Sequence, residues 1–148
     1  MPPEKTDELK IPKKISFKLK PYTVGSPYIE VTHQRIHSLS KEIMADMPET
    51  ATDCNCSICR RLGALWAYYE FGTVRITGHP ENTHEYIQGD KTLATVRCAT
   101  CGCVTHWEPL PPEPGKRHGV NLRNFDPKVL ESVRIRRLDG ADTWQFLD

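Results

Sequence analysis

The sequence of 148 residues has neither a long apolar run nor an excess of charge of either sign. No stretch approaches the roughly 18 apolar residues of a membrane span, so we expect no membrane partner. Lys and Arg total 20 and Asp and Glu total 19, a formal net charge of +1, which argues against a nucleic-acid partner. Residues 1–5 (MPPEK) are polar and precede no apolar segment of a secretory signal. We therefore expect a cytoplasmic protein.

Cysteine is absent except in two short clusters, which together hold all six cysteines of the chain. In a reducing compartment, clustered cysteines are more often metal ligands than disulfides, and thiolate is a preferred ligand of zinc. We interpret the clusters as zinc-binding; the alternative is a redox role in disulfides or sulfur transfer. The first cysteine cluster is Cys54, Cys56 and Cys59, and the second, with the reverse spacing, is Cys98, Cys101 and Cys103.

The two cysteine clusters suggest different kinds of zinc site. Residues 98–102 (CATCG) form a zinc knuckle, in which the glycine after the second cysteine allows a backbone turn that a side chain would oppose. The first cluster offers three ligands, which would leave the fourth position of a zinc ion open to bind a thiol or to polarise a carbonyl. The alternative is one closed site with four ligands drawn from both clusters, and spacing alone does not choose between them.

The chain lacks any long amphipathic helix pattern, so the predicted class is mostly β in a single domain. Residues 1–27 form an N-terminal extension in which lysines interleave with apolar residues. Within it, apolar and polar residues alternate over 15–19, as in an edge strand of a sheet. The alternative is that the extension is a mobile tail. A short helix or loose connection is expected at 38–47, one helical turn at 57–62 and a loop at 110–119. Strands are expected at 28–36, 66–71, 73–77, 83–87, 93–98, 104–108, 120–123, 133–138 and 144–146.

Four motifs, in order, resemble one family. Residues 52–63 (TDCNCSICRRLG) are similar to the cysteine motif of the glutathione-dependent formaldehyde-activating enzyme family, shared with centromere protein V. Residues 98–102 resemble its second cysteine motif, 119–123 (GVNLR) its Val-Asn-x-Arg strand, and 139–144 (DGADTW) its C-terminal end. The resemblance covers residues 28–148, which we take as the zinc domain.

The resemblance implies an Mss4-like, all-β fold with a catalytic-type zinc on the first cysteine cluster and a structural zinc on four cysteines. Two of those four match Cys98 and Cys101. The implied activity is that of a carbon–sulfur lyase, which joins glutathione and formaldehyde as S-hydroxymethylglutathione. The chain departs from the family at Val31 and His33, where a Cys-x-Cys pair usually stands. His33 and Cys103 are the candidate replacements, so one zinc is expected and the second site is incomplete.

Several further residues are candidates for the substrate site. Arg60, beside Arg61, and Arg123 could bind a carboxylate of glutathione, and Asn121 is expected on one strand face with Arg123. His106 could be a ligand or an acid–base group, although a structural strand histidine is the commoner case. The chain is thus predicted to be a zinc-dependent enzyme acting on glutathione adducts of formaldehyde or another small aldehyde; the alternative is a non-catalytic zinc module. Four aromatic residues could wall a pocket or fill the core: Trp66, Tyr68, Tyr69 and Trp107.

Overall fold

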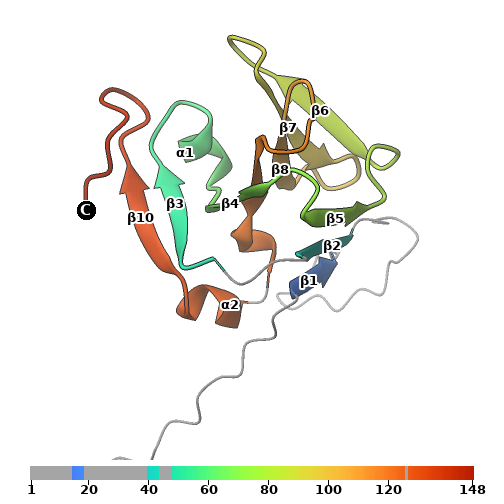
Figure 1. Cartoon of the computed structure of the whole chain (residues 1–148), viewed down its shortest axis with the longest axis horizontal. Helices are drawn as coiled ribbons and strands as arrows, with labels where there is room; N and C mark the ends of the chain where they lie inside the picture. The colour runs from blue at the N-terminus through green and yellow to red at the C-terminus, as the bar shows by residue number, and fades with distance from the viewer. Residues whose placement is uncertain (1–14, 19–39, 44–47, 126) are drawn as a thin grey trace, which may run out of the picture.

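The computed structural model describes residues 15–18, 40–43, 48–125 and 127–148, and these form two β-sheets with little helix (Figure 1). The prediction of a mostly β, single-domain protein is confirmed. The strand expected at 28–36 lies outside the described residues, and so do Val31 and His33.

The larger sheet runs in the order β10-β3-β4-β9-β8-β7-β6. Strands β3 and β10 pair in parallel, and the other neighbours are antiparallel. The expected β6 and β7 are found with the predicted bounds, because each is a short stretch closed by turn residues. The bounds are β3 Thr50–Cys54, β4 Trp66–Glu70, β6 Thr83–Ile87, β7 Leu93–Cys98, β8 Val104–Pro109, β9 Arg117–Asn121 and β10 Arg134–Leu138.

The smaller sheet runs in the order β1-β2-β5, with bounds β1 Ile15–Lys18, β2 Ser40–Ile43 and β5 Val74–Thr77. The edge strand expected at 15–19 is confirmed as β1. The helix or loose connection expected at 38–47 is wrong for its described part, which is β2. That segment pairs with β1 on one side and β5 on the other, so long-range pairing overrides a weak local preference.

Three short helical segments complete the described chain. The turn expected at 57–62 is α1 (Cys59–Leu62), and it ends at Gly63, whose φ of 61° is the left-handed conformation that glycine favours. The 3₁₀ helix η1 (Leu122–Asn124) replaces the second half of the strand expected at 120–123. After it comes α2 (Pro127–Glu131). No helix among the described residues is long and apolar enough to cross a membrane.

The strand expected at 144–146 is wrong. The segment makes a single bridge, between Leu138 and Phe146, and Trp144 has a positive φ of 58°. The backbone N–H of Trp144 donates to the Asp139 carbonyl at 2.7 Å, which closes a tight turn. Local hydrogen bonds therefore hold the segment where an alternating apolar pattern predicted a strand.

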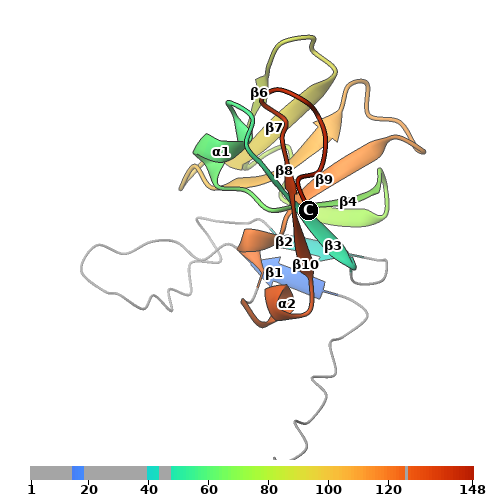
Figure 2. The same cartoon turned by 90° about the vertical axis from the view of Figure 1, so that its left-hand side faces the viewer.

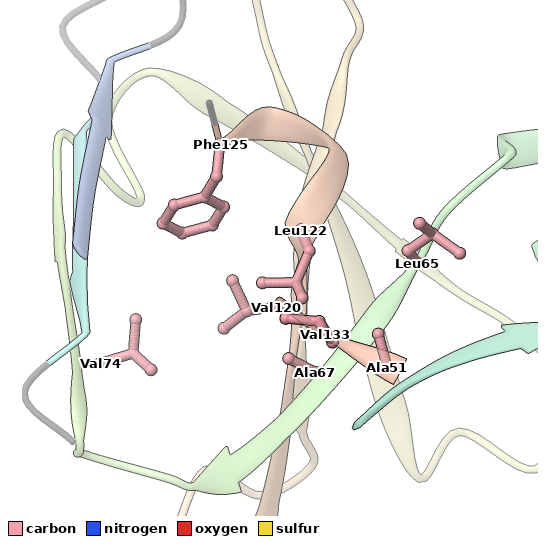
Figure 3. Packing of buried hydrophobic residues seen from close by; sticks show 8 residues of the cluster. All are labelled: Ala51, Leu65, Ala67, Val74, Val120, Leu122, Phe125 and Val133. Carbon is pink, nitrogen blue, oxygen red and sulfur yellow. The ribbon is translucent and has the colours of Figure 1, made fainter. Parts of the chain in front are cut away.

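The hydrophobic core lies between the two sheets (Figure 3). Val74 of β5 faces Ala67 of β4 and Val120 of β9, so apolar packing joins the smaller sheet to the larger one. Among the four aromatic candidates, Tyr69 packs against this core and is partly buried there. The buried cluster comprises Ala51, Leu65, Ala67, Val74, Val120, Leu122, Phe125 and Val133.

Replacing Tyr69 with phenylalanine is expected to stabilise the protein by about 1 kcal/mol at neutral pH. The Tyr69 hydroxyl is buried and makes no hydrogen bond within the described part of the chain, so removing it loses no partner. Burial also raises the pKa of Tyr69 to about 12 from its ordinary 10.0. Between these pH values the unfolded chain ionises and the folded one does not, so stability falls as pH rises, and Tyr69→Phe should reduce that fall.

Thermal melts at pH 7 and pH 11 measure both effects, with roughly 2–4 °C expected per kcal/mol. Tyr86→Phe is the control, because Tyr86 is exposed. A lower melting temperature for Tyr69→Phe at pH 7 would contradict the prediction.

Candidate metal centre

The first cysteine cluster forms where β3 passes into α1. Cys54 is the last residue of β3, Cys59 is the first of α1, and Cys56 lies in the tight connection between them. The three sulfurs lie within 4.8 Å of one another. A zinc–sulfur distance of about 2.3 Å places neighbouring sulfurs of a tetrahedral site about 3.8 Å apart, so the cluster could hold a metal ion such as zinc.

Donors already surround these sulfurs. The backbone N–H of Cys56 points at the Cys54 sulfur at 3.5 Å, and that of Cys59 points at the Cys56 sulfur at 3.4 Å. The indole N–H of Trp66 donates to the Cys59 sulfur at 3.2 Å. Such donors stabilise thiolates and fix their directions, as outer partners do at metal sites.

The three thiols differ in acidity. Burial raises the pKa of Cys59 to about 12, against the lowering effect of the Trp66 indole. Burial also raises the pKa of Cys54. Burial acts in the same direction on Cys56, but the backbone N–H of Cys59 and the neighbouring thiols outweigh it and lower the Cys56 pKa. A divalent cation is what would favour three thiolates together, because it offsets both burial and their mutual repulsion.

A turn from the C-terminal region closes over the cluster. Because β3 and β10 are parallel, their ends meet at the same edge of the sheet, and the segments that follow them lie side by side (Figures 1 and 2). The Asn55 amide donates to the Asp139 carboxylate at 2.8 Å, and the Ala141 backbone N–H donates to the Asn55 side chain at 2.9 Å. Gly140 lies between, so close that a Cβ there would be 2.4 Å from the Cys54 sulfur.

The cluster lies in the wall of a cleft of about 870 Å³. Arg60 lines this cleft, as expected for a substrate residue, and so does Trp144, which is 71 % exposed. Trp107 and Tyr68 are also in the wall, with ring centroids 6.1 Å apart. Three of the four aromatic candidates therefore line the cleft: Trp66, Tyr68 and Trp107.

Arg117 is a cleft residue that the sequence did not indicate. Its guanidinium carbon lies 4.9 Å from the centre of the Tyr68 ring, a cation–π contact, and its side chain lines the cleft. Residues 117–119 were expected in a loop at 110–119, but β9 begins at Arg117. A strand that starts three residues earlier brings this side chain opposite Glu70 of β4 and next to the cleft.

Gly119 leaves space for the indole of Trp107 in the wall of the cleft. It is paired with Tyr68 on one side and with Trp107 on the other. A Cβ at residue 119 would lie 1.9 Å from the Trp107 indole nitrogen, so the indole lies directly on the glycine backbone. The absence of a side chain at this strand position therefore determines where Trp107 can pack.

Asn121 and Arg123 are not on one strand face, because β9 ends at Asn121 and Arg123 belongs to η1. The Asn121 side chain is buried and accepts from the backbone N–H groups of Leu65 and Arg123, both at 3.2 Å, and it donates to the Val104 carbonyl at 2.9 Å. Arg123 is exposed and donates to the Gly63 carbonyl at 2.6 Å. Neither residue lines the cleft, and their hydrogen bonds hold the ends of β4, β8 and α1 together.

The second cysteine cluster forms the expected knuckle, and the thiol of Cys101 interacts with those of Cys98 and Cys103. Gly102 has a φ of 75°, and its N–H donates to the Cys98 carbonyl at 2.9 Å. Cys98 is buried, whereas Cys101 and Cys103 are exposed. Within the described residues, these three do not form a set of donors within 4.8 Å of one another, and none joins the first cluster in such a set.

His106 has partners that the sequence did not reveal. It is fully buried, with Glu108 at 3.1 Å and Thr105 at 2.8 Å from its two ring nitrogens. His79 lies edge-on to it, with ring centroids 5.1 Å apart. Spacing could not have found this set, because His79 comes from another part of the chain.

The chain is similar to a protein of known structure. No protein-family model and no curated protein matches the chain. The crystal structure of a Rhodobacter sphaeroides protein is similar at 28% identity, over 66% of this chain and 91% of that chain, with a TM-score of 0.52. Its name states no activity, so the comparison supports the fold of the aligned part and leaves the family resemblance a prediction.

Proposed function

We propose that the protein is a zinc-dependent carbon–sulfur lyase-like enzyme that acts on adducts of glutathione, or a similar thiol, with formaldehyde or another small aldehyde. The observation that carries the proposal is the position of the first cysteine cluster. Three sulfurs able to hold one ion lie in the wall of an open cleft, and no fourth cysteine of the described chain completes the set. Structural zinc sites are usually closed by four protein ligands, whereas catalytic sites keep one position open.

The donor set fits zinc, and Cys54, Cys56 and Cys59 would hold it. When bound, zinc would supply a position at which a substrate thiol loses its proton and is kept as thiolate. The protein's own contribution is to fix the three ligands through the N–H groups that point at their sulfurs.

The cleft also suits a small, anionic thiol. Glutathione carries two carboxylates, and two guanidinium groups, those of Arg60 and Arg117, line the same cleft. Apolar contact comes from Tyr68 and Trp107, which narrow the cleft beside Arg117. The arginines would bind and orient the thiol carrier, and the aromatic wall would exclude water from the aldehyde carbon.

Isotope exchange between formaldehyde and its glutathione adduct tests the reaction. Metal-loaded protein should accelerate exchange over the uncatalysed rate, and a lack of acceleration would rule out the named reaction. Arg117→Gln should raise KM by about 10- to 100-fold with a smaller change in kcat, because a charge-assisted hydrogen bond contributes about 1.5–3 kcal/mol. Arg97→Gln is the matched control, since it removes the same charge from β7 outside the cleft.

The second candidate is a non-catalytic zinc module that binds a partner. The observation that favours it is the exposure of two aromatic residues, Trp144 and Phe146, in the wall of the same cleft as the cluster. The two candidates differ in the expected behaviour of Cys56→Ser. An enzyme variant should stay folded with one metal ion fewer, whereas in a module stabilised by that zinc the same change should unfold the domain.

A further inference from the structure

A second set of metal-type donors lies on the opposite face of β8 from the cleft. His106 and Glu108 alternate with Trp107 along the strand, and Trp107 faces the cleft. His79 reaches the same place from the connection between β5 and β6. The imidazole Nε2 atoms of His79 and His106 lie 3.4 Å and 3.1 Å from one oxygen of Glu108. We call these three residues the histidine–glutamate cluster.

One threonine hydroxyl lies against the Nδ1 atom of each histidine. The Thr83 hydroxyl donates to the Pro80 carbonyl at 3.0 Å and lies 2.7 Å from His79 Nδ1. When this hydroxyl gives its one proton to Pro80, it accepts a hydrogen bond from the imidazole, and Nδ1 of His79 carries the proton. In that tautomer a neutral His79 has a lone pair at the Nε2 that faces Glu108.

The same pattern holds at His106. The Thr105 hydroxyl donates to the Val96 carbonyl at 3.2 Å and lies 2.8 Å from His106 Nδ1. In that arrangement Nδ1 of His106 is the protonated nitrogen, and its Nε2 directs a lone pair at Glu108. Two imidazole lone pairs and a carboxylate oxygen then converge, which is a set of donors that binds a cation.

We propose that His79, His106 and Glu108 bind a divalent metal ion of the borderline class, such as zinc. Zinc–nitrogen and zinc–oxygen distances of about 2.0–2.1 Å place neighbouring ligands of a tetrahedral site about 3.3–3.4 Å apart. The observed Nε2–Oε1 separations of 3.4 Å and 3.1 Å agree with that geometry. The threonine hydroxyls on both Nδ1 atoms are the outer partners that orient imidazole ligands at metal sites.

Protons on the two Nε2 atoms are the competing occupants. In those tautomers each threonine hydroxyl donates to an Nδ1 atom, and both Nε2–H groups donate to one oxygen of Glu108. One metal ion would bind the same three donors together. An ion can also reach the cluster, because His79 and Glu108 are partly exposed, with side chains 13% and 14% accessible, whereas His106 is fully buried.

The ion would add a link between the end of β5 and β8. His79 follows β5 of the smaller sheet, and the other two ligands belong to β8 of the larger sheet. A metal ion there would cross-link the two sheets beside the hydrophobic core. This site stands apart from the proposed reaction, since it needs neither the cleft nor the first cysteine cluster.

Metal analysis of the full-length protein and two pairs of variants tests the proposal. Zinc-loaded wild type should contain one more equivalent of metal per chain than His79→Gln or Glu108→Gln. The matched controls are His84→Gln and Glu85→Gln, exposed residues of β6 that should keep the wild-type metal content. Because His79 lies at the surface end of the cluster, its variant gives the answer even if Glu108→Gln fails to fold.

Cobalt substitution identifies which site loses the ion. The wild-type spectrum minus that of His79→Gln should show the d–d bands of nitrogen and oxygen ligands and no thiolate-to-cobalt absorption. Equal metal content in wild type and both variants would overturn the proposal, as would a difference spectrum with thiolate character. Nitrogen NMR showing a proton on Nε2 of His79 or His106 in zinc-loaded protein would identify the occupant as a proton and also overturn it.

Discussion

Gly140→Ala is expected to weaken zinc binding at the first cysteine cluster by about 100-fold. The added Cβ would lie 2.4 Å from the Cys54 sulfur and 3.3 Å from the Cys56 Cβ, closer than atoms in contact approach. The turn cannot easily withdraw, because Asn55 hydrogen-bonds the residues on either side of Gly140. The Cys54 sulfur must therefore move away from the other two, and a tetrahedral ion loses its geometry.

The thiolate-to-cobalt absorption of the cobalt-loaded protein measures this loss, because it reports on cysteine ligands alone. Ala141→Ser is the matched control: residue 141 is exposed, and its hydrogen bond to Asn55 comes from the backbone. Unchanged cobalt affinity in Gly140→Ala would show that the turn does not hold the Cys54 sulfur in place.

Gly119→Ala is expected to destabilise the fold by about 3 kcal/mol and to displace Trp107 from the cleft wall. The new Cβ would lie 1.9 Å from the indole nitrogen and 2.3 Å from the adjoining ring carbon. Strand β9 is paired on both sides at this residue, so the backbone cannot shift to relieve the overlap. The indole must rotate away, and Tyr68 loses its aromatic neighbour.

The melting temperature should fall by roughly 2–4 °C per kcal/mol, and the fluorescence of Trp107 should move towards that of an exposed indole. A Trp107→Phe variant separates the two effects, since a smaller ring leaves space for the added methyl group and should partly restore stability to Gly119→Ala. If Gly119→Ala melts like the wild type, the indole is not packed on the glycine.

The strands that were predicted well are those whose signal is local. Strands β6 and β7 are short stretches that end at turn residues, and α1 ends at a glycine with positive φ. Strand β2 was missed because it forms through pairing with β1 and β5, which a local pattern cannot show. The segment at 144–146 was misassigned for the opposite reason, since its turn outweighs an apolar pattern.

Some residues of the candidate site could likewise be predicted from local sequence, and others could not. The spacing of the first cysteine cluster predicted its convergence, and Arg60 follows it directly along α1 into the cleft. Arg117 became visible only when the start of β9 placed it beside Tyr68. The histidine–glutamate cluster joins a residue of the β5–β6 connection to two residues of β8, and Gly140 lies far along the sequence from the sulfur it contacts, so no sequence interval marks either.

The parallel pairing of β3 with β10 has a consequence for how the protein is made. Asn55 and Asp139, which link the cysteine turn to its cover, are 84 residues apart in the chain. Contacts between such distant residues close late in folding, because a long loop must be ordered first. During synthesis, the three thiols therefore leave the ribosome well before their cover exists, and they would be open to oxidation or to capture of a cellular metal until β10 emerges and pairs.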